Sequence, residues 1–157
     1  MKDTFDLCLC HSGKVYADCC QPFHQGVNGG EISNHQAKAV LPLTAEALMR
    51  SRYCAFALAS NYAENQTLVV SMQNYLLATW HESTRPESLD LDLTLKWTEL
   101  KILGRKEGKK RHQKGWVRFN AHYQSSKTLQ QGILSENSEF IKEAGRWFYV
   151  QGEILQE

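Results

Sequence analysis

Four of the five cysteines in this chain lie within thirteen residues near the N-terminus, in the string CLCHSGKVYADCC. They form two close pairs, Cys8 with Cys10 and Cys19 with Cys20, separated by a short polar turn. Packing gives no reason to gather thiols in this way, whereas two close pairs suit tetrahedral ligation of zinc by thiolates. Because a segment of about 26 residues cannot hold a fold by burial alone, we expect a metal ion to stabilise it.

Other interpretations of the same string involve different ligands or no metal. His11 and His24 are alternative ligands, and the cysteines could instead be free or paired in disulfides, including a vicinal bridge between Cys19 and Cys20. A closed site with four protein ligands leaves no position for a substrate. We therefore expect a structural metal site rather than a catalytic one.

Composition places the chain among ordinary globular proteins. It has 157 residues, of which 42% are hydrophobic and 22% charged, enough for one good core and a small appendage. A net charge of +1 excludes a strong overall preference for nucleic acid or anionic membranes. The N-terminus lacks the basic start and apolar stretch of a signal peptide. We therefore expect a cytoplasmic protein. A reducing cytosol keeps thiols free, which favours metal ligation over disulfides for the cysteine cluster.

Helical patterns occupy the middle of the chain. Residues 27–42 contain Gly29-Gly30 and end at a proline, so we expect a linker there. A helix is predicted from Thr44 to Tyr62, with Thr44 as its N-cap. Residues 66–80 predict a second, shorter helical region, either continuous or broken.

The last third of the chain changes to strand-like patterns. The candidate strands are 95–103, 116–123, 129–141 and 146–154. Strict alternation in the first of them places Trp97 and Leu100 on opposite faces. Short loops between the candidates predict antiparallel hairpins. Helices followed by strands favour an α+β fold, with the helices packed on one face of a curved antiparallel sheet.

Two known patterns are similar to this chain. The string CLCHSGKVYADCCQPFHQG resembles the SEC-C motif, a small zinc-binding module also found at the C-terminus of the SecA preprotein-translocating ATPase. The rest resembles the uncharacterised YchJ-like family. The matching segments are LMRSRYCAF (48–56), TWHESTR (79–85), the W-x-x-L from Trp97 to Leu100, and SEFIKEAGRWFYVQG (138–152).

The resemblance implies a SEC-C module over 1–26, a linker over 27–42 and an NTF2-like (cystatin-like) α+β cone over 43–157. It assigns structural Zn²⁺ to the four cysteines named above and carries no catalytic residue, because the family has no established activity. The usual motif reads C-P-C-G-S-G. Here Leu9 replaces the proline and His11 replaces the glycine, which could loosen this turn or offer a competing imidazole.

An NTF2-like cone encloses a pocket between its helices and the concave sheet face. The candidate pocket residues are Arg52, Trp80, His81, Arg85 and Trp97. Such a group could bind a small anion or a flat ligand, although Arg52 could instead pair with Glu136 as a structural ion pair. No acid–base pair can be placed together from the sequence, so catalysis is not favoured.

The segment RKEGKKRHQK, residues 105–114, carries six Lys or Arg residues against one Glu. It falls between two candidate strands, so we expect a long hairpin tip. Lys109, Lys110 and Arg111 could contact RNA phosphates, the ribosome or anionic lipid. A solvated loop is the simpler interpretation.

These observations favour a non-enzymatic, zinc-binding adaptor. Its N-terminal module would hold a protein partner or its own cone in place, as the similar SEC-C module of SecA is a docking element in secretion. Two alternatives remain: the cone binds or turns over a small molecule, or the 105–114 segment associates with RNA or the ribosome. Because NTF2-like domains often dimerise through the open sheet face, we also expect a homodimer.

Overall fold

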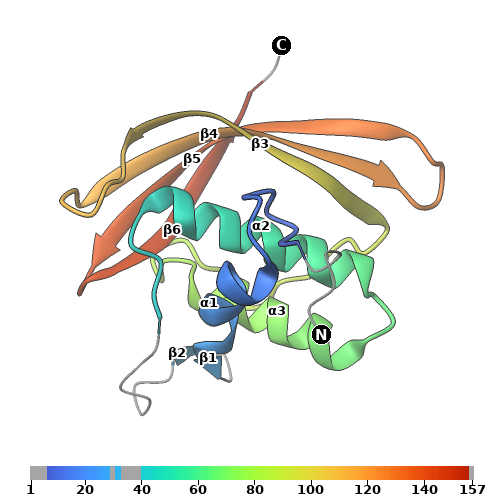
Figure 1. The fold of residues 1–157 in the computed structure, drawn as a ribbon, viewed down its shortest axis with the longest axis horizontal. Helices are drawn as coiled ribbons and strands as arrows, with labels where there is room; N and C mark the ends of the chain where they lie inside the picture. Colours follow the sequence, from blue (N-terminus) through green and yellow to red (C-terminus); the bar gives the residue numbers. More distant parts are fainter. Residues whose placement is uncertain (1–6, 29–30, 33–39, 156–157) are drawn as a thin grey trace.

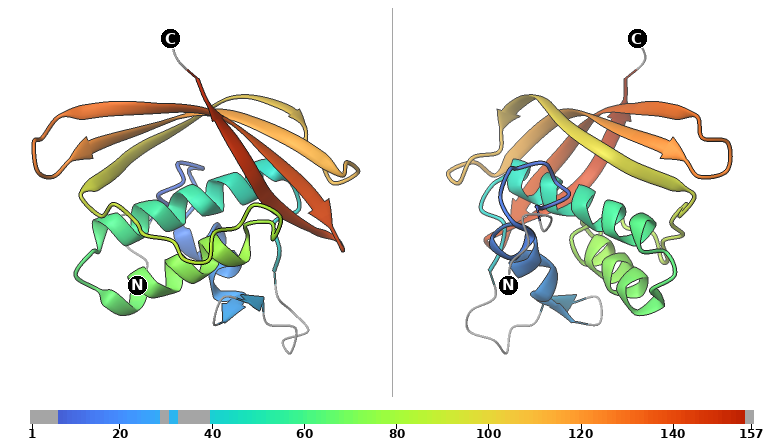
Figure 2. Two further views of the ribbon diagram at one scale, coloured as in Figure 1. Left: turned by 180° about the vertical axis from the view of Figure 1, so that it is seen from behind. Right: turned by 45° about the vertical axis from the view of Figure 1, so that its right-hand side comes forward.

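A curved antiparallel sheet covers two helices, and a small N-terminal module lies beside them (Figure 1). The computed structural model describes residues 7–28, 31–32 and 40–155. Helix α2 lies directly under the sheet, and α3 packs on the side of α2 away from it (Figure 2). The predicted α+β architecture is confirmed.

The two main helices begin at side-chain caps. Helix α2 spans Ala45–Asn61, and the Thr44 hydroxyl accepts a hydrogen bond of 3.0 Å from the backbone N–H of Ala47. Helix α3 spans Gln66–Ala78 and is capped in the same way by Asn65. Each cap satisfies a backbone donor that the first turn leaves free. Both helices lie where the sequence predicted them, and the second one is continuous.

The sheet has the order β3-β4-β5-β6, with each strand antiparallel to its neighbour. The strands are β3 (Leu95–Glu107), β4 (Lys114–Ser125), β5 (Gln131–Glu143) and β6 (Arg146–Ile154). Strands β3 and β4 are longer than predicted, whereas β5 has the predicted length and begins two residues later. As a result, residues 105–107 belong to β3, and the tip of the first hairpin is only the short turn 108–113.

One predicted face is wrong. The pairing of β3 with β4 shifts register between Trp97 and Glu99, which leaves Thr98 as an extra residue. A bulge of this kind breaks the two-residue alternation of side chains. Trp97 therefore packs against the same core cluster that contains Leu100, instead of facing away from it.

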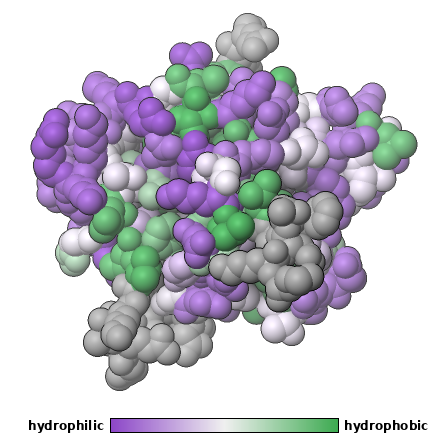
Figure 3. Space-filling model, in the orientation of Figure 1, coloured by the Kyte–Doolittle hydropathy of each residue, from purple (hydrophilic) through white to green (hydrophobic). Residues whose placement is uncertain are grey.

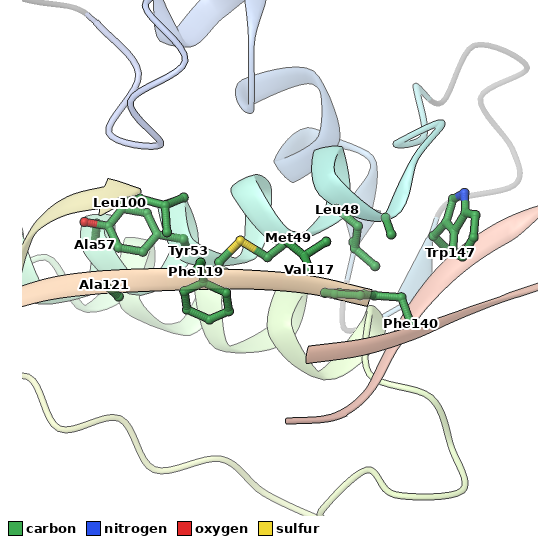
Figure 4. Packing of buried hydrophobic residues seen from close by; sticks show 11 residues of the cluster. Leu48, Met49, Tyr53, Ala57, Leu100, Val117, Phe119, Ala121, Phe140 and Trp147 are labelled. Carbon is green, nitrogen blue, oxygen red and sulfur yellow. The ribbon is translucent and has the colours of Figure 1, made fainter. Parts of the chain in front are cut away.

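The main core lies between α2 and the concave face of the sheet. Leu48, Met49 and Tyr53 of α2 pack there with Val117 and Phe119 of β4 (Figure 4). Met49 and Tyr53 are four residues apart, with Leu48 beside Met49, so they share one side of α2, whereas Val117 and Phe119 are two residues apart and share one face of β4. The alternation predicted in β4 is confirmed.

The N-terminal module contains the short helices η1 (Tyr16–Asp18) and α1 (Gln21–Gln25). The predicted linker begins with a two-stranded pair, β1 (Val27–Asn28) with β2 (Glu31–Ile32). Residues 29–30, which are the Gly29-Gly30 pair, and residues 33–39 of the predicted linker lie outside the described residues.

Two surface findings bear on the expected partners. On the face shown in Figure 3, hydrophobic residues form small groups among hydrophilic ones. Within the described ranges, no helix has the length and apolar character that a membrane span needs.

Candidate metal centre and cavity

The four cysteines of the N-terminal string come together at one point. Their sulfur atoms all lie within 4.8 Å of one another. The Sγ atoms of Cys10 and Cys19 are 3.5 Å apart, and those of Cys19 and Cys20 are 3.9 Å apart. Metal–sulfur bonds of about 2.3 Å in a tetrahedron separate the sulfurs by about 3.8 Å. All the cysteines are free thiols, so the cluster could hold a metal ion and contains no vicinal disulfide.

The loop between the cysteine pairs is shaped by its backbone. The Cys8 N–H donates to Lys14 O at 2.8 Å, and the His11 N–H donates to Cys8 O at 3.2 Å. His11 has φ of 64° and Gly13 has φ of 89°, both in the left-handed region that favours glycine. This backbone explains why the usual motif has glycine where this chain has His11. The His11 side chain is exposed and lies outside the thiol cluster.

His24 is not available as a ligand, because both ring nitrogens are occupied. Nε2 donates to the carbonyl oxygen of Ser51 at 2.9 Å, and Nδ1 accepts from the Tyr16 hydroxyl at 2.7 Å. Burial lowers the pKa of His24, which keeps the ring neutral. His24 therefore anchors the N-terminal module to α2.

A second anchor comes from α2 itself. Arg50 donates from Nη1 to the carbonyl oxygen of Cys10 at 2.8 Å and from Nε to Glu46 at 2.9 Å. Burial works to raise the pKa of Glu46, but hydrogen bonds from Arg105 and Arg50 outweigh it and lower that pKa. The carboxylate therefore stays charged and holds Arg50 against the cysteine loop.

The fifth cysteine was missed as part of this cluster. Sequence analysis gave no role to Cys54, yet its Sγ lies 3.7 Å from that of Cys8. Cys54 is completely buried in one cluster with Cys8, Cys10 and Cys20. No spacing rule connects residues 46 positions apart, so only the packing of the module on α2 reveals the contact between Cys54 and Cys8.

A cavity of about 230 Å³ lies between α2 and the concave face of the sheet. Most of its wall is apolar: Met49, Phe56, Trp97, Phe119, Ala121 and Leu134. The hydroxyl of Tyr53, which also lines the cavity, is buried and has no hydrogen-bond partner among the described residues. An unsatisfied buried hydroxyl is uncommon, because it costs about 1–3 kcal/mol.

Arg52 supplies the positive charge of the cavity wall. Its side chain is 6% exposed, and Nη1 donates to Leu76 O at 2.7 Å and to Thr79 Oγ1 at 2.6 Å. The guanidinium carbon lies 4.6 Å from the ring centre of Tyr149 and 5.4 Å from that of Trp80. Burial lowers its pKa to about 10, so Arg52 remains protonated at neutral pH.

The ion pair considered for Arg52 is not formed. Glu136 also lines the cavity, but its carboxylate accepts from the Ser138 hydroxyl at 2.6 Å. Within the described part of the chain, no carboxylate lies in ion-pair distance of Arg52.

The predicted pocket residues divide into two groups. Arg52, Trp80 and Trp97 line the cavity, whereas His81 and Arg85 lie outside it. Trp80 forms an isolated bridge with Tyr149 of β6, and neighbouring residues of extended chain project to opposite sides. His81 consequently points away and bonds to Glu143 at 2.7 Å, and Arg85 is exposed.

The basic segment is partly neutralised. Arg105 pairs with Glu46, and the Lys106 ammonium lies 5.1 Å from the ring centre of Trp116. Lys109, Lys110 and Arg111 remain exposed on the hairpin tip. Lys114, at the start of β4, is also exposed, so four of the six basic residues of this segment lie outside the contacts described for Arg105 and Lys106.

Comparison with known proteins identifies the family. Residues 44–152 match the model of the YchJ middle NTF2-like domain, and residues 6–22 match the SEC-C motif. The chain belongs to the YchJ family. The expected SEC-C module and NTF2-like domain are confirmed, whereas their exact boundaries stay a prediction.

The similarity to relatives in this family covers almost the whole chain. A UPF0225 protein of Streptomyces coelicolor is 40% identical over 94% of this chain and 95% of its own length. One from Corynebacterium efficiens is 37% identical over 99% of this chain and its full length. The solution structure of a SEC-C motif containing protein from Rhodopseudomonas palustris has a TM-score of 0.66 at 29% identity, covering 95% of this chain and 98% of the other.

Proposed function

We propose that this YchJ-family protein binds a small, mainly apolar molecule with an acidic group in the cavity under its sheet. The observation that carries the proposal is Arg52, a buried guanidinium without a carboxylate partner at the wall of an apolar cavity. A buried charge is costly unless it is paired and hydrogen-bonded. A carboxylate ligand would supply the missing partner.

The rest of the wall supports the same kind of ligand. Nε and Nη2 of Arg52 form no hydrogen bond within the described chain, so they are free to donate to a bound carboxylate. About 230 Å³ is below the usual range of ligand pockets, about 300–1,000 Å³, so the ligand contains one ring or a short branched chain.

The metal module has a structural part in this proposal. Four thiolates form a closed ligand set, which suits structural Zn²⁺ in a reducing cytoplasm. The thiols face α2 of the same chain, and α2 also contributes Arg52 to the cavity. We therefore propose that the module holds the NTF2-like domain of its own chain in place. The sequence suggested two roles for the module, and this is one of them; the other is to hold a protein partner.

Binding can be followed by the fluorescence of the two cavity tryptophans, Trp80 and Trp97. Benzoate, phenylacetate and 3-methylbutyrate are the probes, each compared with its neutral amide. We expect a saturable change with at least one carboxylate and binding weaker by about tenfold or more for its amide, since hydrogen bonds to charged groups contribute about 1.5–3 kcal/mol. Arg52→Met should lose this preference, whereas Arg85→Met should keep it.

A second measurement does not depend on these variants. Native mass spectrometry of protein purified gently, without chelator, should show one zinc ion and a reproducible organic adduct per chain. A folded wild-type protein with no adduct and no response to any probe would contradict the ligand-binding proposal. The same spectrum reports the subunit number and so tests the expected homodimer.

The remaining expectations about partners stay predictions. If Lys109, Lys110 and Arg111 contact RNA, binding should weaken steeply with salt and disappear when the three charges are reversed. Cross-linking through residues 1–26 in cells would identify a protein partner of the module.

A further inference from the structure

We infer that Cys54 of α2 is a fifth sulfur donor of the metal centre and can replace Cys19 as the fourth ligand. In that arrangement the ion joins the SEC-C module directly to the NTF2-like domain. The motif assigns ligands only within the N-terminal string, so this donor comes from the packing of the two domains.

The distance between the sulfurs of Cys54 and Cys8 suits two ligands of one ion. The Sγ atoms of Cys54 and Cys8 are 3.7 Å apart, within the 3.5–3.9 Å separations found inside the motif. Sulfurs that share a tetrahedral ion through bonds of about 2.3 Å lie about 3.8 Å apart. Cys54 therefore already lies at ligand spacing from Cys8, and to become a ligand it has to move closer to the other sulfurs of the group that lie within 4.8 Å of one another, to which it does not belong.

Cys19 and Cys54, the two residues that would exchange, differ in burial. Cys8, Cys10, Cys20 and Cys54 are 4%, 0%, 1% and 0% exposed. Cys19 is only partly buried, and its sulfur lies 3.1 Å from the Ser12 hydroxyl. A set made from the first four would consist of buried thiolates only, whereas Cys19 at the outer edge can be released toward solvent.

The exchange balances in charge and protons. With Cys19 bound, Cys54 is a neutral thiol beside the Cys8 thiolate. When the Cys54 sulfur binds the ion, its proton passes to the released Cys19 thiolate, directly or through solvent. Four thiolates surround the divalent ion before and after, so the centre keeps its net charge of −2. Each arrangement leaves one neutral thiol, which is buried in the first and accessible in the second.

The inference is tested with Co²⁺, whose absorption spectrum distinguishes four thiolate ligands from three. Wild type and Cys54→Ser should both give the four-thiolate spectrum, because Cys19 completes the set in each. Cys19→Ser should also give it, because Cys54 takes the empty position. The double variant Cys19→Ser/Cys54→Ser should give a three-thiolate spectrum. If Cys19→Ser alone has the spectrum of the double variant, the inference is wrong.

A measurement on the unmodified chain covers the case in which a variant fails to fold. Zinc-loaded wild-type protein is treated with iodoacetamide, and the products are analysed by native mass spectrometry and peptide mapping. We expect the first label on Cys19 with the zinc ion retained. Zinc loss in step with labelling of Cys19 would show that Cys54 does not replace it.

Discussion

At the scale of single residues, the loop between the cysteine pairs contains a visible strain. His11 and Gly13 both adopt positive φ, yet only one of them is a glycine. A residue with a side chain adopts this backbone conformation at a cost of about 1–2 kcal/mol. Glycine avoids most of this cost, but its conformational freedom also increases the entropy of the unfolded chain, which offsets part of the gain. The His11 side chain makes no metal contact that would compensate.

His11→Gly should therefore stabilise the protein by about 0.5–1 kcal/mol. Gly13→Ala is the matched variant: an added Cβ would meet no atom within 4 Å, so its cost comes from the backbone alone. We expect it to destabilise by about 1 kcal/mol. Chemical denaturation of the zinc-loaded proteins measures both. A destabilised His11→Gly protein would assign a structural contact to the imidazole.

A second residue, His24, makes stability depend on pH. Its pKa is lowered in the folded protein, so the unfolded chain binds a proton first as the pH falls below about 6.5. The contribution of His24 is complete above that pH and decreases below it, by up to about 1.4 kcal/mol per pH unit. His24→Gln should flatten the decline of the unfolding free energy between pH 7 and pH 5.

Loss of zinc in acid affects His24→Gln and wild type alike, so the difference between their two slopes isolates the contribution of His24. Equal slopes for His24→Gln and wild type would contradict the assignment of a buried, neutral ring.

Residues differ in how far the sequence could predict them. The four cysteines of the motif are recognisable because their spacing is local. Cys54 and the unpartnered hydroxyl of Tyr53 have no local signal, because their roles depend on which distant segments pack against α2. For the same reason, the sequence could not tell that Trp80 lines the cavity and that its neighbour His81 points away from it. This difference depends on how the chain pairs with β6 at Trp80.

At the scale of elements, helix α2 connects the metal centre to the cavity. Arg50 and Cys54, one helical turn apart, face the N-terminal module. Arg52 and Phe56 are also one turn apart and line the cavity. A single helix therefore carries both sites on different faces, and a change in one face can reach the other through a rigid element.

Removal of the metal should consequently loosen α2 more than the sheet. With the ion gone, the thiols repel when they ionise and the anchors at Cys10 and His24 lose their support, since structural zinc contributes about 10 kcal/mol or more to such modules. Amide hydrogen exchange before and after chelation measures this. Residues 48–56 should exchange about tenfold faster or more, while residues 117–121 of β4 change little.

The zinc-treated variant Cys8→Ser/Cys10→Ser/Cys54→Ser, which keeps only two of the five sulfurs, should reproduce this exchange pattern without a chelator. Equal acceleration in α2 and β4 would mean that the metal stabilises the whole fold uniformly, and would remove the special role given to α2.

Helices and strands were predicted well where their features depend on a local sequence pattern. They were predicted poorly where the features depend on how one strand pairs with another. The cap at Thr44 and the alternation in β4 are properties of short segments, and both are correct. The bulge near Trp97 is invisible to a two-residue alternation, because it depends on how β3 pairs with β4. The extension of β3 into the basic segment likewise follows from its pairing with β4.

At the scale of the whole molecule, the cavity is a cost in stability. Space left between α2 and the sheet forfeits contacts that a fully packed core would make. Ala121 lies on this wall and is 2% exposed, while Ala57, which is also buried, belongs to the same core cluster but does not line the cavity. A small residue therefore keeps the cavity open at one position and fills a tight space at the other.

Because of this difference, we expect the change from alanine to valine to have opposite effects on stability at the two positions. Ala121→Val should stabilise the ligand-free protein by about 0.5–2 kcal/mol, as cavity-filling changes do. It should also weaken benzoate binding in the tryptophan titration, because the added methyl groups occupy ligand space. Ala57→Val should destabilise by about 1–3 kcal/mol through overpacking. Destabilisation of similar size at both positions would show that the space under the sheet is closed in solution, and the proposed ligand site would have to be abandoned.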